Sequence, residues 1–480
     1  MLKNETTDTV IVGAGISGLT TARNLVKKGI KVKILEKNSV AGGSIRTEKK
    51  DGFLVEYGPN SALETTPLLG ELFKDLKIDH QMLYANEKSN NRYIVRGGKL
   101  QALPMKPLAF LKSGLFSTRA KLRLFKEPFI APSPAETRET LAQFVERRLG
   151  KEFLDYAIDP FVAGVFAGLP EKLCVQSAFP KLYEVEQKYG SLIKGTIRGA
   201  RERRKSKETS KQRAKMFSFE DGLQTVIDAL VNELGNNLVT ESQITGISKM
   251  KDGGYEVSYR NREEEFLIRT KSVLLTVPAH VYEKLPFHFE VTPGAFFKTI
   301  PYPPVTMVFF GYRKKPENVN LDGFGFLIPK KENKNILGSI WSSTIFPNRA
   351  PEGGAAFTTF VGGSRQPENA MLTEDKIAEM VEEDFKSLMG INQKPDVVVI
   401  KRWEQAIPQY NLEHIEMIGS VEKFEKKNPG MFISGNFRGG ISVADCVKQA
   451  DAMSLTVSEF INSEVDNINY QNVSKTGTDK

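Results

Sequence analysis

The feature that most constrains this chain of 480 residues lies near its N-terminus. A short β-branched apolar run at 9–12 (TVIV) leads directly into GAGISG at 13–18, and an apolar-periodic helix is predicted over 19–28. A second strand is predicted over 31–35. In a strand–turn–helix unit of this kind, glycines allow a tight turn, close approach of the backbone to a pyrophosphate, and close packing of helix on strand. The pattern therefore predicts an α/β fold with a Rossmann-like dinucleotide-binding domain.

An acidic residue stands where this unit needs one. Glu36 ends the second predicted strand, and a carboxylate there can accept hydrogen bonds from both ribose hydroxyls. This favours FAD or NAD over a cofactor with a 2′-phosphate, while the helix N-terminus offers free N–H groups to the phosphates. The cofactor-binding residues predicted from this unit are Gly13, Ala14, Gly15, Ile16, Ser17, Gly18, Glu36 and Lys37.

Two further glycine-containing turns follow within 25 residues. The first is AGGSIRT at 41–47, where Arg46 supplies a cation for a pyrophosphate or a flavin ring, and the second is EYGPNS at 56–61. Adjacent glycines again permit close backbone approach to a ligand. From these turns we predict cofactor contacts by Gly43, Ser44, Arg46, Gly58, Pro59, Asn60 and Ser61.

Near the other end of the chain, an apolar strand at 431–434 enters a glycine-rich turn over 435–440, and a helix is predicted from there to about residue 461. A strand that ends in glycines and opens a helix again points free N–H groups at an anionic group. The predicted cofactor residues of this segment are Gly435, Ile441, Ser442 and Val443. Because the two halves of one site lie so far apart in sequence, the cofactor domain must be discontinuous.

Composition excludes several classes of function. No apolar run approaches the ~18–20 residues that span a bilayer, and the N-terminus lacks the basic and apolar regions of a secretion signal. Cys174 and Cys446 are too few for a disulfide framework, and the four histidines have no zinc-binding spacing. We therefore predict no metal site and a cytoplasmic location.

Basic residues are concentrated in one run. Between 198 and 215 there are nine Lys/Arg and two Glu, within a net charge of +9 for the chain. The run is either a solvated face or a site of attraction to anionic lipid or an acidic partner. We expect no nucleic-acid partner, because no aromatic residue interleaves the run and no nucleic-acid-binding module surrounds it.

Together, the glycine turns at both ends of the chain resemble the FAD site of the flavoprotein amine-oxidase superfamily. Segments in the middle of the chain resemble the protoporphyrinogen/coproporphyrinogen oxidase family of that superfamily. The resemblance as a whole covers roughly residues 8–460. The segments that carry this resemblance are 91–94 (NRYI), 98–100 (GKL), 159–168 (DPFVAGVFAG), 178–182 (AFPKL), 186–191 (EQKYGS), 323–329 (GFGFLIP), 346–350 (FPNRA), 360–365 (FVGGSR) and 403–410 (WEQAIPQY).

The resemblance implies a chemistry and its site residues. Noncovalent FAD would remove hydride from a porphyrinogen, and O2 would reoxidise the flavin to give H2O2. Three such cycles complete a six-electron oxidation in heme biosynthesis. The product would then pass to a chelatase. Arg92 matches an arginine that pairs with a substrate propionate, and Gly168 matches a glycine whose carbonyl faces the pyrrole N–H groups. No residue is assigned as a catalytic acid or base. The apolar substrate contacts implied are Phe161, Phe324, Leu327 and Ile340, and we add Ile244 and Trp403 to the cofactor site.

The same reasoning divides the chain into a discontinuous cofactor domain, a mixed-sheet substrate domain and a helical insertion. Residues 106–129 mix apolar and basic side chains, which suits either a helix in a membrane interface or a basic helix over a core. A peripheral contact with the inner face of the membrane is thus one alternative. The predicted segments are 1–85, 217–300 and 399–465 for the cofactor domain, 86–105 and 301–398 for the substrate domain, 106–216 for the insertion, and 466–480 for a flexible tail.

Some alternatives stay open. A flavin amine oxidase or polyene desaturase would share the cofactor site, and a flavin-less GDP-dissociation-inhibitor-like binding protein would share the fold. Protoporphyrinogen IX and coproporphyrinogen III differ by two vinyls against two propionates, that is, by two negative charges. The sequence decides neither between these two substrates nor the oligomeric state.

Overall fold

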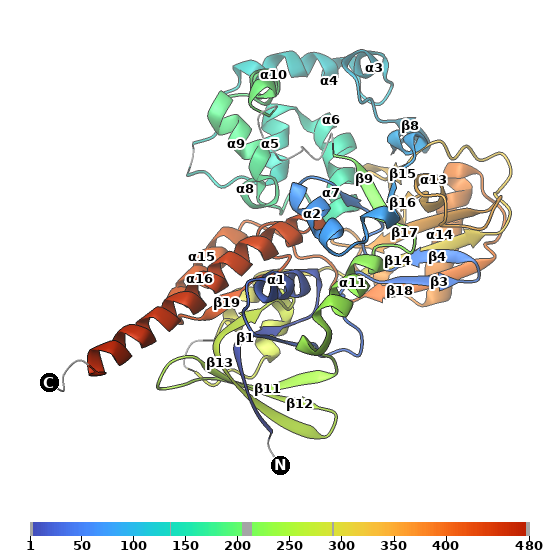
Figure 1. Cartoon of the computed structure of the whole chain (residues 1–480). Coiled ribbons are helices and arrows are strands. Elements are labelled where there is room, and N and C mark those ends of the chain that lie inside the picture. Colours follow the sequence, from blue (N-terminus) through green and yellow to red (C-terminus); the bar gives the residue numbers. More distant parts are fainter. Residues whose placement is uncertain (1–2, 135, 204–213, 290–291, 477–480) are drawn as a thin grey trace.

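The computed structural model describes residues 3–134, 136–203, 214–289 and 292–476. Most of the basic run at 198–215 and the last four residues of the predicted tail therefore lie outside the described residues. Two seven-stranded sheets and a group of helices make up the molecule (Figure 1). No helix in the described part of the chain is both long and apolar enough to cross a bilayer.

The first sheet carries the N-terminal glycine turn. Strand β1 (Lys3–Val12) runs parallel to β2 (Val32–Leu35) on one side and to β13 (Glu264–Leu275) on the other. Strand β19 (Met431–Ile433) pairs in parallel with the end of β13. The sheet is completed by β10 (Leu238–Val239), β11 (Ser242–Lys249) and β12 (Tyr255–Asn261), in the order β10-β2-β1-β13-β12-β11.

Helices cover both faces of this sheet, which explains the continuous apolar run at the end of β1. Ile11 points into a core shared with α1 (Ile16–Lys27), α11 (Gln224–Leu234) and α16 (Val443–Thr476). Val10 and Val12 point into the opposite core. That core contains α12 (Gly294–Phe297) and α15 (His414–Lys427). Helix α16 extends beyond the end expected near residue 461, and the backbone of residues 466–476 continues it.

The second sheet has the strand order β18-β14-β17-β16-β15-β7-β8. One face packs against α14 (Glu374–Met389). The other face packs partly against a hairpin of β3 (Thr47–Lys50) and β4 (Phe53–Glu56) from the cofactor-binding half. Its strands are β7 (Tyr93–Arg96), β8 (Lys99–Ala102), β14 (Val305–Tyr312), β15 (Gly325–Leu327), β16 (Ile336–Ile340), β17 (Ala355–Gly362) and β18 (Val397–Trp403).

Two of our sequence boundaries differ from the observed pairing. Strand β18 pairs along its whole length with β14, so residues 399–403 belong to the second sheet and not to the cofactor domain. The predicted insertion ends at residue 216, but Met216 is the first residue of strand β9 (Met216–Phe219). This strand forms a small sheet with β5 (Ala62–Leu63) and β6 (Met82–Tyr84). Both differences come from strand pairing between distant segments, which local sequence does not report.

The helical insertion lies above both sheets in Figure 1. It begins after β8 and ends before β9. Its elements are α3 (Pro107–Lys112), α4 (Thr118–Arg123), η3 (Leu124–Phe129), α5 (Leu141–Arg148), α6 (Lys151–Phe153), η4 (Leu154–Ile158), α7 (Asp159–Phe166), α8 (Val175–Ala178), α9 (Pro180–Tyr189) and α10 (Leu192–Arg203).

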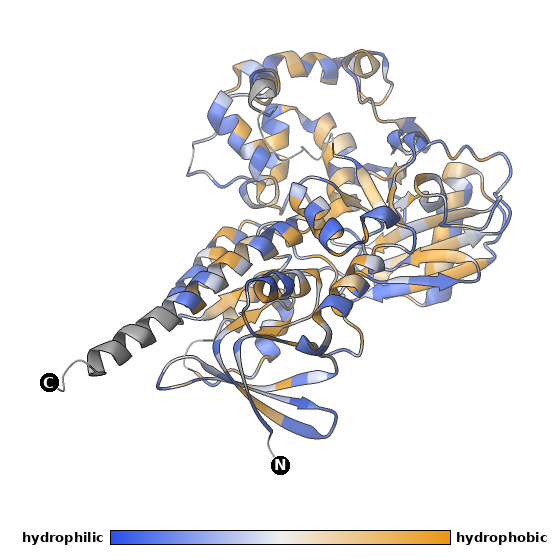
Figure 2. Cartoon of the chain, in the orientation of Figure 1, coloured by the Kyte–Doolittle hydropathy of each residue, from blue (hydrophilic) through white to orange (hydrophobic). Residues whose placement is uncertain are grey.

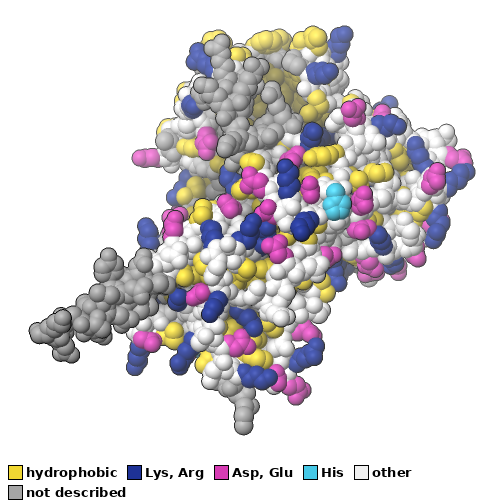
Figure 3. Space-filling model, in the orientation of Figure 1, with side chains coloured by type: hydrophobic (Ala, Val, Ile, Leu, Met, Phe, Trp, Pro, Cys, Tyr) yellow, Lys and Arg dark blue, Asp and Glu magenta, His cyan; other side chains and the backbone are white. Residues whose placement is uncertain are grey.

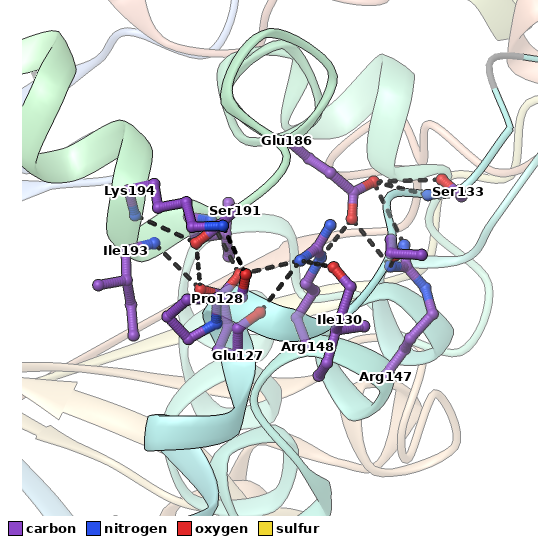
Figure 4. A network of polar contacts seen from close by, with 12 residues as sticks. Glu127, Pro128, Ile130, Ser133, Arg147, Arg148, Glu186, Ser191, Ile193 and Lys194 are labelled. Carbon is purple, nitrogen blue, oxygen red and sulfur yellow. Dashed lines mark hydrogen bonds and ion pairs between the residues drawn. The ribbon is translucent and has the colours of Figure 1, made fainter.

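A buried ionic network ties four of these elements together (Figure 4). Arg148 on α5 is fully buried and pairs with Glu127 of η3 and Glu186 of α9, which are also fully buried. Glu127 in turn accepts hydrogen bonds from the backbone N–H groups of Leu192 and Ile193, at 2.9 and 3.2 Å, and so caps the N-terminus of α10. The network therefore fixes η3 and α10 to the core of the insertion.

Replacing Arg148 by methionine should destabilise the protein strongly. The change leaves Glu127 and Glu186 buried without this shared cation, and loss of one partner of a buried pair costs about 3–5 kcal/mol of unfolding free energy. The measurement is urea-induced unfolding of wild type and variant at neutral pH. Arg138→Met is the matched control, because Arg138 pairs with Glu416 at the exposed surface. A comparable loss in both variants would contradict the role given to the network.

Candidate active site

The turn between β1 and α1 forms only because two of its glycines lack side chains. A Cβ on Gly18 would lie 2.1 Å from the carbonyl oxygen of Gly13 and 2.7 Å from Oγ1 of Thr276, which follows β13. Gly13 has φ +104°, a conformation that side chains disfavour. Gly15 differs from both, since a Cβ there would meet nothing within 4 Å. The backbone at Gly15 thus borders open space at the N-terminus of α1, as a phosphate-binding turn requires.

Glu36 is held directly beside this turn. Its carboxylate accepts hydrogen bonds from the backbone N–H of Ala14 at 2.8 Å and from the backbone N–H of Asn38 at 2.9 Å. The backbone of Glu36 also pairs with Ser242, at the start of β11, and Ile244 lies two residues farther along that strand. The structure therefore brings Glu36 and Ile244 to the same end of the first sheet, whereas Lys37 is exposed.

The second and third glycine turns close over the first. The backbone N–H of Gly42 donates to Ala14 at 2.8 Å, and a Cβ on Gly43 would lie 3.6 Å from Cα of Gly15. A Cβ on Gly58 would lie 1.9 Å from the carbonyl oxygen of Ser44, so these two turns are in direct contact. Arg46 is exposed and makes no ion pair with any residue that the structure describes. Pro59, Asn60 and Ser61 follow as a half-buried segment.

The C-terminal turn reaches the same place through helix packing. Helix α16 packs along α1: Thr21 donates to the carbonyl of Ala450, and the thiol of Cys446 contacts Ser17. Ser442 caps α16 by accepting from the N–H of Asp445 at 3.1 Å. The N-termini of α1 and α16 therefore lie together, with Ile441 and Val443 beside them and Gly435 at the end of β19.

Cys446 bears on how a flavin would be attached. Its side chain is buried where α16 packs on α1, and burial raises the pKa of the thiol to about 11. A buried, protonated thiol is a poor nucleophile. This agrees with noncovalent binding of the cofactor.

The segment 403–410 connects the cofactor turns to the insertion. Trp403 donates from Nε1 to the carbonyl of Tyr57 at 2.9 Å. The Tyr410 hydroxyl donates to the carbonyl of Asn436 at 2.6 Å and accepts from the N–H of Gly440 at 3.1 Å. Burial raises the pKa of Tyr410 well above its usual range, so this hydroxyl stays a hydrogen-bond donor.

On the substrate side, Arg92 stands apart from the other arginines of this region. Its guanidinium lies over the ring of Phe324, 5.2 Å from the centroid, and it has no carboxylate partner among the residues that the structure describes. Arg96 and Arg365, by contrast, pair with Glu152 and Asp159. Arg92 is therefore available to an anionic ligand. Desolvation lowers the pKa of its guanidinium, and a guanidinium keeps its charge in proteins.

The face of α7 beside the second sheet is apolar and accessible. Phe161 and Val165 are each 39% exposed although they lie within the molecule's helical insertion. Between them, a Cβ on Gly164 would lie 2.4 Å from Leu327 of β15, so α7 approaches the sheet closely. Ile340 of β16 pairs with Gly325, next to Leu327. These residues form an apolar wall next to Arg92, and buried Gly168 follows the end of α7.

Three buried polar residues of this region were not predicted as site residues. Glu56, Gln409 and Tyr410 lie in the sequence segments that carry the family resemblance, but burial was not visible there. Glu56 accepts from Thr47 and from the N–H of Leu223, and lies 3.7 Å from Arg349 of the substrate half. In the sequence, only the position of these three residues could have indicated a role in the site, since each lies in a glycine- or proline-containing segment next to a predicted site residue.

Comparison with known proteins agrees with this geometry. Residues 16–452 match the family of flavin-containing amine oxidoreductases. The fold is similar to the crystal structure of an Exiguobacterium protein (TM-score 0.77, 22% identity, 95% of this chain and 99% of that one). It is also similar to putrescine oxidase (TM-score 0.69, 14% identity, 95% and 100% of the two chains). The protein is thus a flavoprotein oxidoreductase of the amine-oxidase fold, and its cofactor is FAD.

The curated relatives narrow the family. Chloroplastic protoporphyrinogen oxidase of Nicotiana tabacum is 33% identical, over 95% of this chain and 86% of its own length. Coproporphyrinogen III oxidase of Bacillus subtilis is 28% identical, over 92% of this chain and 96% of its own. The chain belongs to the protoporphyrinogen/coproporphyrinogen oxidase family, which confirms the resemblance inferred from its sequence.

The residues present fit FAD. Open space at Gly15, the N-termini of α1 and α16 and the carboxylate of Glu36 lie close together, and such groups would suit a pyrophosphate and a ribose. Arg46, which has no ion pair among the described residues, belongs to the turn that packs on Gly15. Backbone N–H groups at the start of α16 suit the electron-rich edge of a flavin.

The stability of the protein should depend on pH through Glu56. Burial raises its pKa from 4.5 to about 7, so its contribution is complete below pH 4.5 and is lost as the pH rises through 7. Between pH 5 and 8 wild type should lose roughly 2–3 kcal/mol more unfolding free energy than Glu56→Gln. Urea-induced unfolding of wild type and Glu56→Gln at both pH values measures the difference in unfolding free energy. Parallel pH dependence of the two proteins would rule it out.

Proposed function

We propose that this protein is an FAD-dependent porphyrinogen oxidase of heme biosynthesis that uses O2 and releases H2O2. The observation that carries the proposal is Arg92, whose guanidinium lies over Phe324, has no carboxylate partner within the described ranges, and stands beside the accessible apolar face of α7. A porphyrinogen combines a large apolar macrocycle with peripheral carboxylates, so it requires both features. The names of the relatives, protoporphyrinogen oxidase and coproporphyrinogen III oxidase, support the same substrate class.

Bound FAD supplies the two-electron oxidation, and three rounds complete the conversion to the porphyrin. The chain's own residues bind and orient the substrate. Arg92 pairs with a propionate and thereby sets the position of the ring in its plane. Phe161, Phe324, Leu327 and Ile340 exclude water around the macrocycle, and Gly168 brings bare backbone close to it.

Anaerobic mixing tests the proposal. The FAD-loaded protein is mixed separately with protoporphyrinogen IX and with coproporphyrinogen III, and flavin bleaching and porphyrin fluorescence are followed. Rapid bleaching by one or both supports the function and identifies the substrate. If neither bleaches the flavin while FAD stays bound, the proposal is wrong.

Arg92→Ala should raise the KM for the porphyrinogen that reacts by about 10- to 100-fold, because a charge-assisted hydrogen bond contributes ~1.5–3 kcal/mol. FAD content should not change, since Arg92 makes no contact with the glycine turns. Steady-state kinetics of wild type and Arg92→Ala measure the change in KM. Arg262→Ala is the control, because Arg262 is an exposed arginine remote from α7. An unchanged KM in Arg92→Ala would remove this residue from the substrate site.

We further propose that the insertion contacts an anionic membrane surface. Several large apolar side chains of α3, α4, η3 and α10 are exposed, and Figure 3 shows hydrophobic side chains at this edge of the molecule. Basic residues lie among them in sequence, namely the exposed Lys106, Lys112, Arg119 and Lys126. Exposed apolar side chains with neighbouring cations are typical of interfacial helices. The apolar side chains of these elements and their exposed fractions are Leu108 73%, Leu111 55%, Leu122 61%, Phe125 69%, Phe129 86% and Ile197 71%, and Met105, which precedes α3, is 62% exposed.

Co-sedimentation with vesicles tests this contact. The double variant Leu108→Glu/Phe129→Glu should bind vesicles of phosphatidylcholine with 30% phosphatidylglycerol at least tenfold more weakly than wild type, because it removes apolar burial and adds repulsion. Leu455→Glu, at an exposed leucine of α16, is the matched control. Equal binding by all three proteins would exclude the surface.

The cellular setting follows from the same proposal. We infer a cytoplasmic enzyme at the inner face of a membrane, where a poorly soluble porphyrin could pass to a chelatase. Two buried cysteines that form no disulfide are consistent with a reducing compartment.

A further inference from the structure

The end of α7 is held from two sides. Helix α7 ends at Phe166, and the next residue, Ala167, caps it with left-handed backbone torsions (φ +49°, ψ +31°). The carbonyl of Ala167 accepts from the N–H of Ser364, which follows β17, at 2.7 Å. The carbonyl of the preceding residue, Phe166, accepts from Nε2 of Gln409 at 2.7 Å. The turn that leads to Gly168 is therefore fixed to the second sheet and to segment 403–410.

Gln409 is buried and only partly satisfied. Its residue exposure is 2%, and Nε2 also donates to the carbonyl of Ile407 at 3.0 Å. Its other side-chain atom, Oε1, has no hydrogen-bond partner among the described residues. This oxygen lies 2.2 Å from the place that a Cβ on Gly168 would occupy. A side chain at position 168 and the present conformation of Gln409 therefore exclude each other.

The same short segment is bonded to the cofactor turns. Trp403 donates to Tyr57, and Tyr410, next to Gln409, bonds both Asn436 and Gly440. No helix or strand boundary intervenes between Gln409 and Tyr410. A displacement of the turn at Gly168 would thus change the spacing between the apolar face of α7 and the cofactor turns.

We propose that Gln409 is a positioning residue, which sets the distance between the substrate-facing turn at Gly168 and the cofactor turns, and that residue 168 is glycine because of Gln409. This inference rests on the proposed function for the identity of the substrate. Gln409 does not reach the substrate, since its unpaired oxygen is covered. Its effect passes through the backbone of Phe166–Gly168.

A double-mutant cycle tests the coupling, with wild type, Gly168→Ala, Gln409→Ala and the double variant. Each single change should raise the KM for porphyrinogen about tenfold, with FAD content unchanged. The double variant should be at least fivefold less impaired than the product of the two single effects, because removal of the Gln409 side chain makes room for the new Cβ. Thermal unfolding and the flavin absorbance change on titration with oxidised porphyrin provide two readouts that do not depend on turnover.

Two further variants separate positioning from folding. Gln409→Met keeps the length of the side chain but removes its donors, so it should raise KM while thermal unfolding shows that the variant is still folded. Gln405→Met is the control, because Gln405 is exposed in the same segment. If Gly168→Ala does not fold alone, recovery of folding in the double variant still supports the coupling.

The outcomes distinguish the two proposals. An active wild type whose single effects multiply within twofold in the double variant overturns the inference and leaves the function standing. An active wild type with unaltered KM in Gln409→Met also overturns it. A wild type that retains FAD but oxidises neither porphyrinogen overturns both.

Discussion

The parallel pairing of four strands brings four segments of the candidate cofactor site to one edge of the first sheet. Strands β2, β1, β13 and β19 run in one direction, so their carboxyl ends share one edge of the first sheet. Glu36, the turn at Gly13, Thr276 and the turn at Gly435 follow those ends in turn. The close contact of Gly18 with Gly13 then sets α1 against the sheet, and α16 packs on α1. Ligands of open α/β sheets bind at such an edge.

The second constraint is the link between this edge and the second sheet. Segment 403–410 leaves β18, bonds the cofactor turns through Trp403 and Tyr410, and holds α7 through Gln409. Strand pairing fixes one end of the segment and hydrogen bonds fix the other. These hydrogen bonds, of which the one from Gln409 to Phe166 is buried and the others are half-buried, connect the two halves of the site through one short segment.

The helical insertion contains a buried ionic network within its apolar core and exposes several large apolar side chains at its surface. Figure 2 shows hydrophobic residues along its helices as well as in the sheets. Arg148, Glu127 and Glu186 occupy its interior, where their charges are paired, while Leu108 and Phe129 are exposed. Such an arrangement is costly for a surface in water alone, and it agrees with contact with a lipid surface. The ionic network gives that surface a defined shape by holding η3 to α10.

The sequence by itself determined the nucleotide-binding unit, because the strand, the turn GAGISG, the helix and Glu36 are adjacent and each has a local signature. It also determined the family, since characteristic segments extend over the whole chain. Only the tertiary structure decided that residues 399–403 belong to the second sheet, that Arg92 has no carboxylate partner in the part of the chain that the structure describes, and that Glu56 and Gln409 are buried. Pairing and burial depend on neighbours distant in sequence, so no local pattern records them.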